Sequence, residues 1–171
     1  METWDAIRSR RDVRTFEDRA VPPEHLTRIL EAGRRSPSAS NWQPWDFVVV
    51  TDRDRLEALA RVRQSARHVA RSAATIALVA SIPRGAREER LLYFDLGQVA
   101  MSMMLEASDL GIGAGHASVG DQDMARSVLG FPDDKFCAHL IVLGYPSDRP
   151  LIPVQRPDRR AYDDVVHMGR W

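Results

Sequence analysis

Residues 34–47, RRSPSASNWQPWDF, are the stretch on which the interpretation of this chain depends. The pattern before it has helical spacing and the run at residues 46–50 is rich in β-branched residues, so the stretch is expected to join a helix to a buried strand. It contains two amides, Asn41 and Gln43, and two tryptophans. So many polar and stacking side chains are unusual for one connection and call for an explanation, and packing is the default explanation for Trp45 beside a strand.

The expected helix before this stretch follows Pro22 and Pro23, either of which suits a first helical turn. Its apolar positions recur at the i, i+3, i+4 and i+7 spacing of one helix face. These positions are Leu26, Ile29, Leu30 and Gly33. Downstream we expect, in order, a helix capped by Asp52 or Asp54, a buried strand over 74–80, a helix over about 88–110, a strand over 117–119, a helix capped by Asp121 and a strand over 138–143.

The helix expected over about 88–110 is apolar around most of its circumference. One apolar stripe includes Leu96 and Met103, and another includes Phe94 and Met101, which leaves only a narrow polar line. In a chain of this size, so much apolar helix surface predicts that a second subunit buries part of it. The order of elements indicates an α+β or α/β sandwich in one domain over residues 1–171, with an extended C-terminal arm from Tyr145.

The composition of the 171 residues argues against several classes of function. The 24 basic and 24 acidic residues balance, so the chain lacks the excess positive charge typical of proteins that bind nucleic acid or anionic membranes. The longest apolar run, residues 73–80, is shorter than the ~20 residues that span a bilayer, and we expect a cytoplasmic protein. A single cysteine, Cys137, and five histidines without ligand spacing predict no disulfide and no metal site.

Two local patterns, taken alone, leave alternatives open. Arg10, Arg11 and Arg14 have the guanidinium forks that bind a phosphate, but a solvated turn in an arginine-rich protein is the simpler explanation and is favoured on this pattern alone. The glycines of GIGAG at residues 111–115 invite comparison with a dinucleotide-binding loop, yet they follow a helix and precede a strand, which is the reverse of the required order. Gly111 is better interpreted as a helix C-cap.

Five segments together resemble the flavin-dependent nitroreductase family over essentially the whole chain. They are RSRRDVRTF at 8–16, VPPEHLTRILEAGRRSPSASNWQPWDFVVV at 21–50, LGIGAG at 110–115, LGYP at 143–146 and RRAYDDVV at 159–166. The resemblance implies an α+β fold with a mostly antiparallel central sheet between helices and the long helix at a dimer interface. It further implies a homodimer that shares two FMN molecules and passes hydride from NADH or NADPH to nitroaromatic, quinone or similar acceptors by a ping-pong mechanism.

The resemblance also implies which residues bind FMN. Arg10, Arg11 and Asp12 match the residues at its phosphate, and Arg14 matches the basic residue beside N1 and O2 of the flavin ring. Arg14 and Ser118 are the candidate catalytic residues, although the flavin itself performs the chemistry. The implied cofactor-binding set is Arg10, Arg11, Asp12, Arg14, Pro37, Ser38, Ala39, Asn41, Ala117, Ser118, Val119, Arg159 and Arg160, with residues 37–41 contributed by the partner chain.

Asp12 departs from the nitroreductase pattern, in which this position is often Ser. The same Asp, with a Ser that matches Ser118, occurs in the related dimethylbenzimidazole synthase, which fragments reduced FMN with oxygen. That activity is therefore an alternative, although Asn41 and the lack of room for a long lid favour a reductase. A flavin-binding module without turnover is a second alternative. Few residues separate the strand over 74–80 from the long helix, so the resemblance implies an open flavin site with broad acceptor tolerance.

Overall fold

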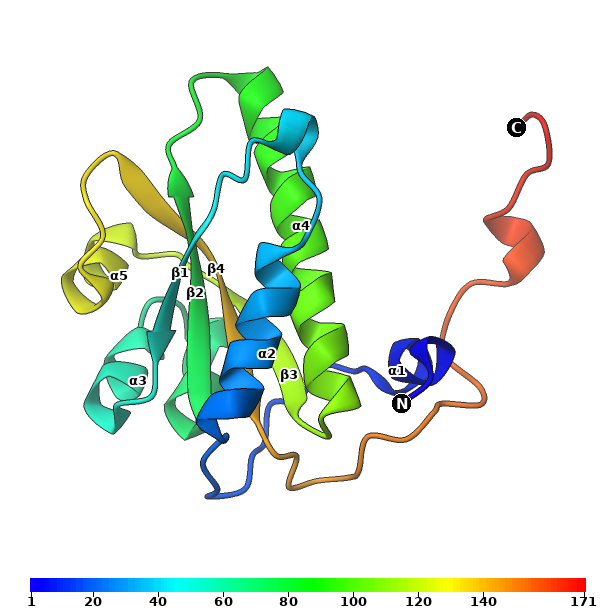
Figure 1. Cartoon of the computed structure of the whole chain (residues 1–171), viewed down its shortest axis with the longest axis horizontal. Coiled ribbons are helices and arrows are strands. Elements are labelled where there is room, and N and C mark those ends of the chain that lie inside the picture. The colour runs from blue at the N-terminus through cyan, green and yellow to red at the C-terminus, as the bar shows by residue number, and fades with distance from the viewer.

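A four-stranded antiparallel sheet forms the centre of the computed structural model, which describes residues 1–171 (Figure 1). The strand order is β1-β2-β4-β3, and helices cover both faces of the sheet. The predicted α+β fold with an antiparallel sheet is therefore confirmed. The strands are β1 (Asp46–Val50), β2 (Ala74–Ser81), β3 (Gly113–Ser118) and β4 (Lys135–Gly144).

One face of the sheet is covered by α2 (Pro23–Arg34) and the long α4 (Ala86–Asp109). Pro23 is the first residue of α2, where its missing N–H costs no hydrogen bond. Ile29 and Gly33 lie on the buried face of the helix, as the periodicity predicts. A Cβ at Gly33 would collide with Met103, so glycine allows α2 to pack closely on α4.

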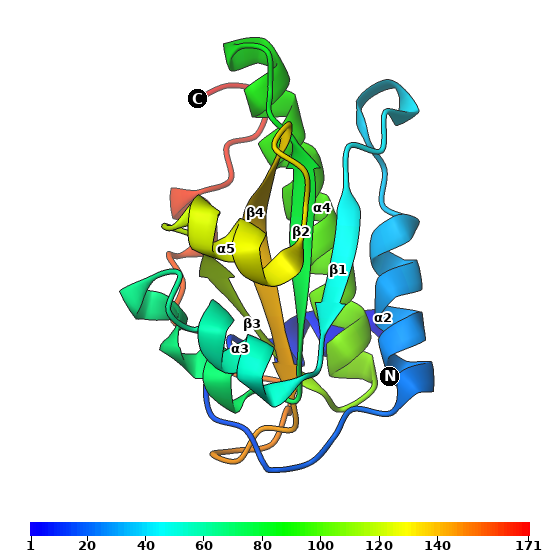
Figure 2. The same cartoon turned by 90° about the vertical axis from the view of Figure 1, so that its left-hand side faces the viewer.

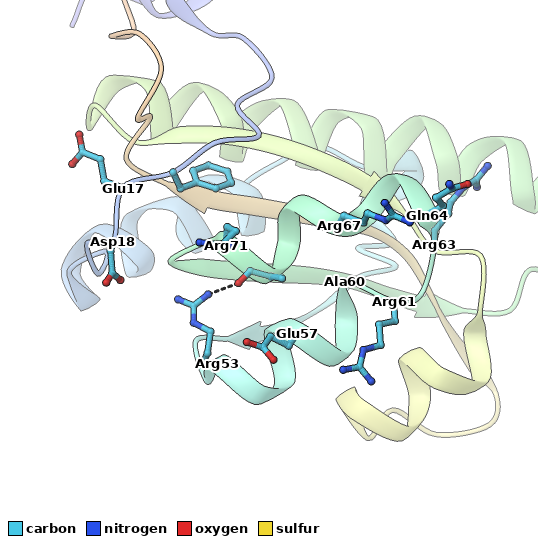
Figure 3. A pocket seen from close by; sticks show the side chains of 12 residues that line it. Glu17, Asp18, Arg53, Glu57, Ala60, Arg61, Arg63, Gln64, Arg67 and Arg71 are labelled. Atoms are coloured by element: carbon cyan, nitrogen blue, oxygen red, sulfur yellow. Dashed lines mark hydrogen bonds between the residues drawn. The ribbon is translucent and has the colours of Figure 1, made fainter.

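The opposite face carries α3 (Arg53–Leu59), the 3-10 helix η2 (Gln64–Arg71) and α5 (Gln122–Leu129), which lie in front of the sheet in Figure 2. Asp52 caps α3 by accepting a hydrogen bond from the Arg55 backbone N–H at 3.0 Å. The apolar sides of these helices form a second core against the sheet, and arginines of α3 and η2 surround a hollow on their outer side (Figure 3). The sequence analysis did not predict η2.

The strand expected over 117–119 begins four residues earlier, at Gly113. The reason is a tertiary contact, because the Val13 backbone N–H donates to Ala114 O at 3.0 Å along the free edge of β3. A Cβ at Gly115 would lie 2.5 Å from Val13 O, so glycine is what permits this close approach. Glycines weaken the strand signal of the sequence while making this edge contact possible.

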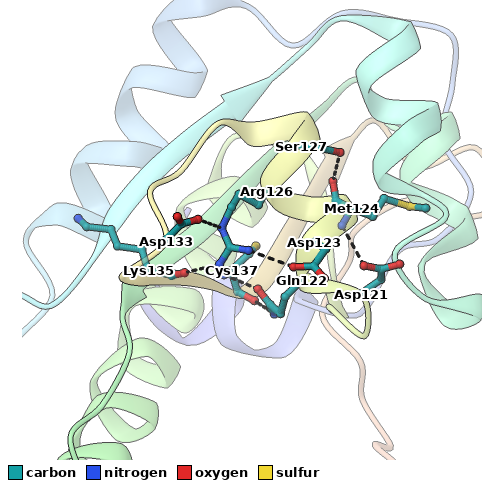
Figure 4. A network of polar contacts seen from close by, with 9 residues as sticks. All are labelled: Asp121, Gln122, Asp123, Met124, Arg126, Ser127, Asp133, Lys135 and Cys137. Carbon is teal, nitrogen blue, oxygen red and sulfur yellow. Dashed lines mark hydrogen bonds and ion pairs between the residues drawn. The ribbon is translucent and has the colours of Figure 1, made fainter.

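A β-bulge interrupts the pairing of β2 with β4. Leu78 is opposite His139 and Val79 is opposite Cys137, which leaves Ala138 as the extra residue. Gln122 of α5 occupies the gap, because its amide accepts from Cys137 N at 2.9 Å and donates to Cys137 O at 2.8 Å (Figure 4). Arg126 of the same helix donates to Lys135 O at 3.3 Å, so α5 is bonded at two positions to the part of β4 that precedes the bulge.

Segments from the two ends of the chain meet beside α4. Helix α1 (Thr3–Ser9) packs against α4, and the backbone of Arg8 accepts a hydrogen bond from Val154 N at 3.1 Å. The C-terminal arm after Tyr145 passes α1, ends in the short 3-10 helix η3 (Tyr162–Asp164) and extends away from the sheet (Figure 1). None of the helices combines the length and the hydropathy needed to cross a membrane.

Candidate functional site

A cavity of about 1370 Å³ opens between α1, α4, strands β3 and β4, and the C-terminal arm. Typical pockets for small ligands measure about 300–1,000 Å³, so this cavity has room for more than one bound molecule of that size. Its polar lining comes from segments far apart in the sequence. These polar residues include Arg8, Arg10, Arg11, Asp12, His116, His139, Arg149 and Arg159.

Arg11 connects the start of the chain to the arm. Its Nη2 donates to Asp148 Oδ1 at 2.6 Å and to Arg149 O at 2.7 Å. The hydrogen bond from Arg11 to the carboxylate is the largest cause that holds the pKa of Asp148 below its usual value, and a backbone hydrogen bond from Arg149 adds to it. The side chain of Arg11 is only 15% exposed, and its Nε is buried without a hydrogen-bond partner. The cavity wall therefore contains a buried cationic donor that no protein group satisfies.

Asp12 lies between a cation and an imidazole. Its Oδ1 is 3.5 Å from Arg10 Nη1 and 3.4 Å from His116 Nδ1. His116 stacks on His139 with ring centroids 5.6 Å apart, and burial lowers the pKa of His139. The sequence analysis missed both histidines as cavity residues. If the strand had been predicted to begin at Gly113, the alternation of side chains would have placed His116 and Ser118 on one face, next to the strand that carries His139.

The remaining wall of the cavity is apolar and belongs mainly to α4. A lining that combines arginines with apolar side chains suits a ligand that carries a phosphate on a flat, largely apolar ring system. The apolar lining includes Leu78, Leu96, Ala100, Met104 and Ala138. Because Ala138 is the bulged residue, the irregularity in β4 contributes directly to the shape of this wall.

Several residues predicted to bind FMN do not line this cavity. Arg14, Ser118 and Arg160 lie outside its lining, as do Ala117 and Val119. Arg14 is exposed on the side of η2. Burial of the His68 ring lowers the pKa of His68, and the nearby positive charge of Arg14 lowers it further. Arg160 donates to Asp164 O at 2.6 Å within the arm. Of the predicted residues, only Arg10, Arg11, Asp12 and Arg159 line the cavity.

The connection at residues 37–43 is conformationally strained. Ser40, Asn41 and Gln43 have φ angles of 51°, 56° and 53°, in the left-handed region that residues other than glycine rarely adopt. Two side chains hold this conformation: the buried Asp95 accepts from Ala39 N at 3.0 Å, and Ser38 Oγ accepts from Gln43 N at 2.8 Å. Strain that is maintained by buried contacts is characteristic of functional connections.

This connection and the cavity lie on two sides of the same ridge of α4. Pro37 lines a separate hollow, and the residues Tyr93, Gly97 and Met101 border both that hollow and the cavity. Residues 37–41 of one chain therefore do not reach the arginines of its own cavity. The ridge between them is exposed, and Phe94 on it has 68% of its surface accessible.

The nitroreductase family model matches residues 7–145 of the chain. The chain belongs to the nitroreductase family. A nitroreductase relative from Methanothermobacter thermautotrophicus, provisionally named NADH dehydrogenase/NAD(P)H nitroreductase, is 30% identical over 100% of this chain and 88% of its own. The 5,6-dimethylbenzimidazole synthase of Rhodospirillum rubrum is 27% identical over 84% of this chain and 82% of its own. An FMN-dependent nitroreductase from Clostridium difficile shares the fold, with a TM-score of 0.84 at 21% identity over 97% of this chain and 98% of its own.

Membership of the nitroreductase family makes the chain an oxidoreductase, and the cavity can be tested for its fit to FMN. A phosphate requires cationic donors, which Arg10, Arg11 and Arg159 supply in the lining of the cavity. The unsatisfied Nε of Arg11 indicates that a further acceptor is needed there. The apolar wall along α4 matches a fused aromatic ring system. The residues present therefore fit the cofactor.

Proposed function

We propose that the protein is an FMN-dependent oxidoreductase that uses NADH or NADPH to reduce nitroaromatic, quinone or similar acceptors by a ping-pong mechanism. The observation that carries this proposal is that Arg10 and Arg11, near the start of the chain, and Arg159, in the C-terminal arm, line one cavity. Paired arginines bind phosphate bidentately and remain charged at every physiological pH, so they would hold the FMN phosphate.

The other residues would orient the cofactor and adjust its charge distribution. FMN, when bound, supplies the hydride chemistry itself. Arg14 would place a permanent positive charge near the pyrimidine part of the ring, which favours a negatively charged ring there. The backbone around Ala117, Ser118 and Val119 would offer hydrogen bonds to the ring edge, and Arg160 would join Arg159 near the phosphate. None of these roles requires a side chain that donates or removes a proton.

A second copy of the chain would complete the site. The exposed ridge of α4 includes Tyr93, Phe94 and Met101, and apolar surface of this kind is usually buried in an assembly. The ridge separates the arginine cavity from the strained connection at 37–43. A homodimer that joins two such ridges would bring Pro37, Ser38, Ala39 and Asn41 of one chain to the FMN of the other.

The acceptor would enter without passing a lid. Strand β2 ends at Ser81 and α4 begins at Ala86, which leaves no segment long enough to fold over the cavity from that side. An open site would tolerate acceptors of different shapes, and water would remain in contact with the ring.

The test of this proposal is a comparison of the wild-type protein with Arg11→Ala and with the matched control Arg55→Ala. Arg55 is exposed on α3 and does not line the cavity. Loss of one charge-assisted contact of about 1.5–3 kcal/mol should weaken FMN binding by at least about tenfold in Arg11→Ala only. Fluorescence titration with FMN measures this. Bound flavin should then bleach anaerobically with NADH or NADPH and recover its colour with a quinone. Equal FMN affinity in all three proteins would contradict the proposal.

A second candidate activity, oxygen-dependent fragmentation of FMN, is supported by Asp12 and by the similarity to the synthase of Rhodospirillum rubrum. Asp12 faces the cavity beside Arg10 and His116, at the end where the phosphate would bind. Incubation of the reduced holoprotein in air separates the two activities. Release of dimethylbenzimidazole would identify the synthase, whereas recovery of intact FMN would favour the reductase.

A further inference from the structure

A second hollow, of about 920 Å³, lies on the opposite side of the sheet from the arginine cavity described above. It is bordered by α3, η2 and the segment at residues 16–18 (Figure 3). We call it the α3/η2 hollow. Its lining consists of Phe16, Glu17, Asp18, Arg53, Glu57, Ala60, Arg61, Arg63, Gln64, Arg67, Ala70 and Arg71.

The α3/η2 hollow concentrates positive charge in a chain whose overall charge is zero. Five arginines line it, against the three carboxylates Glu17, Asp18 and Glu57. None of these arginines forms an ion pair with a carboxylate: Arg53 donates to Ala70 O at 2.5 Å, and Arg61, Arg63, Arg67 and Arg71 make no side-chain hydrogen bond to the protein. Four guanidinium groups around one hollow therefore keep all their donors available to a ligand.

Helical spacing explains how the arginines converge. On α3, Arg53 and Glu57 are four residues apart and share one side of the helix, and Arg61 follows in the turn after it. The 3-10 helix η2 has three residues per turn, so Gln64, Arg67 and Ala70 share the side that lines the hollow, with Arg63 just before the helix and Arg71 at its end. The other sides of both helices are buried against the sheet in the second core. Because the buried sides fix the rotation of each helix, Arg53 of α3 and Arg67 of η2 line the same hollow from two elements.

The α3/η2 hollow adjoins two segments that the proposed function places at FMN. Phe16 is two residues beyond Arg14. At the other end, Val62 O accepts hydrogen bonds from Gly120 N at 3.1 Å and Asp121 N at 2.9 Å, which places Arg63 directly after this contact. The segment that follows Ser118 and Val119 is thus joined to the edge of the hollow.

We propose that the α3/η2 hollow is a binding site for a small molecule that carries several phosphate charges, separate from the cavity that would hold FMN. Unpaired guanidinium groups that line one hollow can bind phosphate oxygens bidentately. Two sources of this chemistry are compatible with the position of the hollow. One is the phosphorylated adenosine part of NADPH, which rests on the proposed function, and the other is an independent phosphorylated effector.

The first experiment is a calorimetric titration of the FMN-saturated protein with inorganic pyrophosphate at low salt. FMN should occupy the arginine cavity during the titration, which requires no turnover. If FMN does not bind, the hollow variant described next still distinguishes binding in the α3/η2 hollow from binding elsewhere, so the two failures are separable. We expect binding that weakens as salt rises. The double variant Arg67→Gln/Arg71→Gln should bind at least about tenfold more weakly, because two charge-assisted contacts are lost.

The matched control is Arg55→Gln/Arg170→Gln, which removes the same charge from two exposed residues outside the hollow and should bind like the wild type. Thermal unfolding gives a second measurement, because pyrophosphate should raise Tm of the wild type and the control but not that of the double variant. Absence of binding, or equal weakening in both variants, would overturn the proposal.

The two sources are separated by steady-state kinetics on the same proteins. A rise in KM for NADPH without a rise in KM for NADH in the double variant assigns the hollow to the phosphate of NADPH. If both KM values stay unchanged while pyrophosphate binding is lost, the hollow binds an independent phosphorylated ligand.

Discussion

The two helical layers of the protein differ in what they present on their outer sides. The ridge of α4 presents Tyr93, Phe94 and Met101, which are exposed and apolar. The outer sides of α3 and η2 present arginines around a hollow. Water solvates the arginine layer well and the apolar ridge poorly. The outer side of the α3/η2/α5 layer therefore needs no further protein to cover it, whereas the exposed apolar ridge of α4 is suited to burial by another subunit.

The most severe test of this contrast is Phe94→Asp. The new carboxylate would be buried at an interface between two α4 ridges without a partner, which should weaken self-association by at least about a hundredfold. Ser127→Asp places the same charge on the outer side of α5 and serves as the control. Sedimentation velocity of the three proteins measures the effect. An unchanged sedimentation coefficient for Phe94→Asp would show that α4 is not the contact surface.

The completeness of the α3/η2/α5 layer is tested by Gln122→Leu. Cys137 would lose both backbone partners, N–H and C=O, and unsatisfied buried groups cost about 1–3 kcal/mol each. We expect a decrease in Tm of roughly 5–10 °C without a change in oligomeric state. Gln155→Leu, in the exposed arm, is the control.

The alkylation rate of the Cys137 thiol measures the effect of Gln122→Leu independently of Tm. Burial raises its pKa to about 12 and its side chain is inaccessible, so it should resist alkylation in the native protein. In Gln122→Leu, alkylation at neutral pH should be faster than in the wild type, because the bulge beside Cys137 opens more often. Equal alkylation rates would show that Gln122 does not stabilise the bulge.

The smallest change in stability is expected for the ion pairs of Glu31 on the outer side of α2. Hydrogen bonds from Arg34 and then Arg35 lower the pKa of Glu31 to about 2 from an ordinary 4.5. The stabilisation from the ionised carboxylate is therefore complete above pH 4.5 and is lost as the pH falls toward about 2. Glu31→Gln should lower Tm slightly at neutral pH, because the pair is exposed to solvent. Circular dichroism melts should show that this difference narrows as the pH falls through that range; a constant difference would contradict the assignment.

The order of the elements was predictable because it depends on local periodicity. The pattern of Leu26, Ile29 and Gly33 gave the buried side of α2, and the β-branched runs gave β1 and β2. The start of β3 was not predictable in this way. Its glycines lower strand propensity, and the reason for them is the approach of Val13, which is distant in the sequence.

The arrangement of the candidate site was predictable only through resemblance to a family. Arg10 and Arg159 are separated by most of the chain, and no local pattern indicates that they line one cavity. The contact of His116 with Asp12 and its stacking on His139 depend on the register of β3 with β4 and on the bulge at Ala138. Such geometry follows from tertiary pairing rather than from residue spacing. The binding of FMN by these residues stays a prediction.

The left-handed backbone at Ser40, Asn41 and Gln43 has a consequence for assembly. Asp95 and Ser38 hold this segment in shape within the isolated chain, so little freedom remains to be lost when another subunit arrives. Two subunits would then associate through preformed surfaces, and this segment would not have to become ordered on binding. The lifetime of the complex would depend on how slowly the apolar ridges separate.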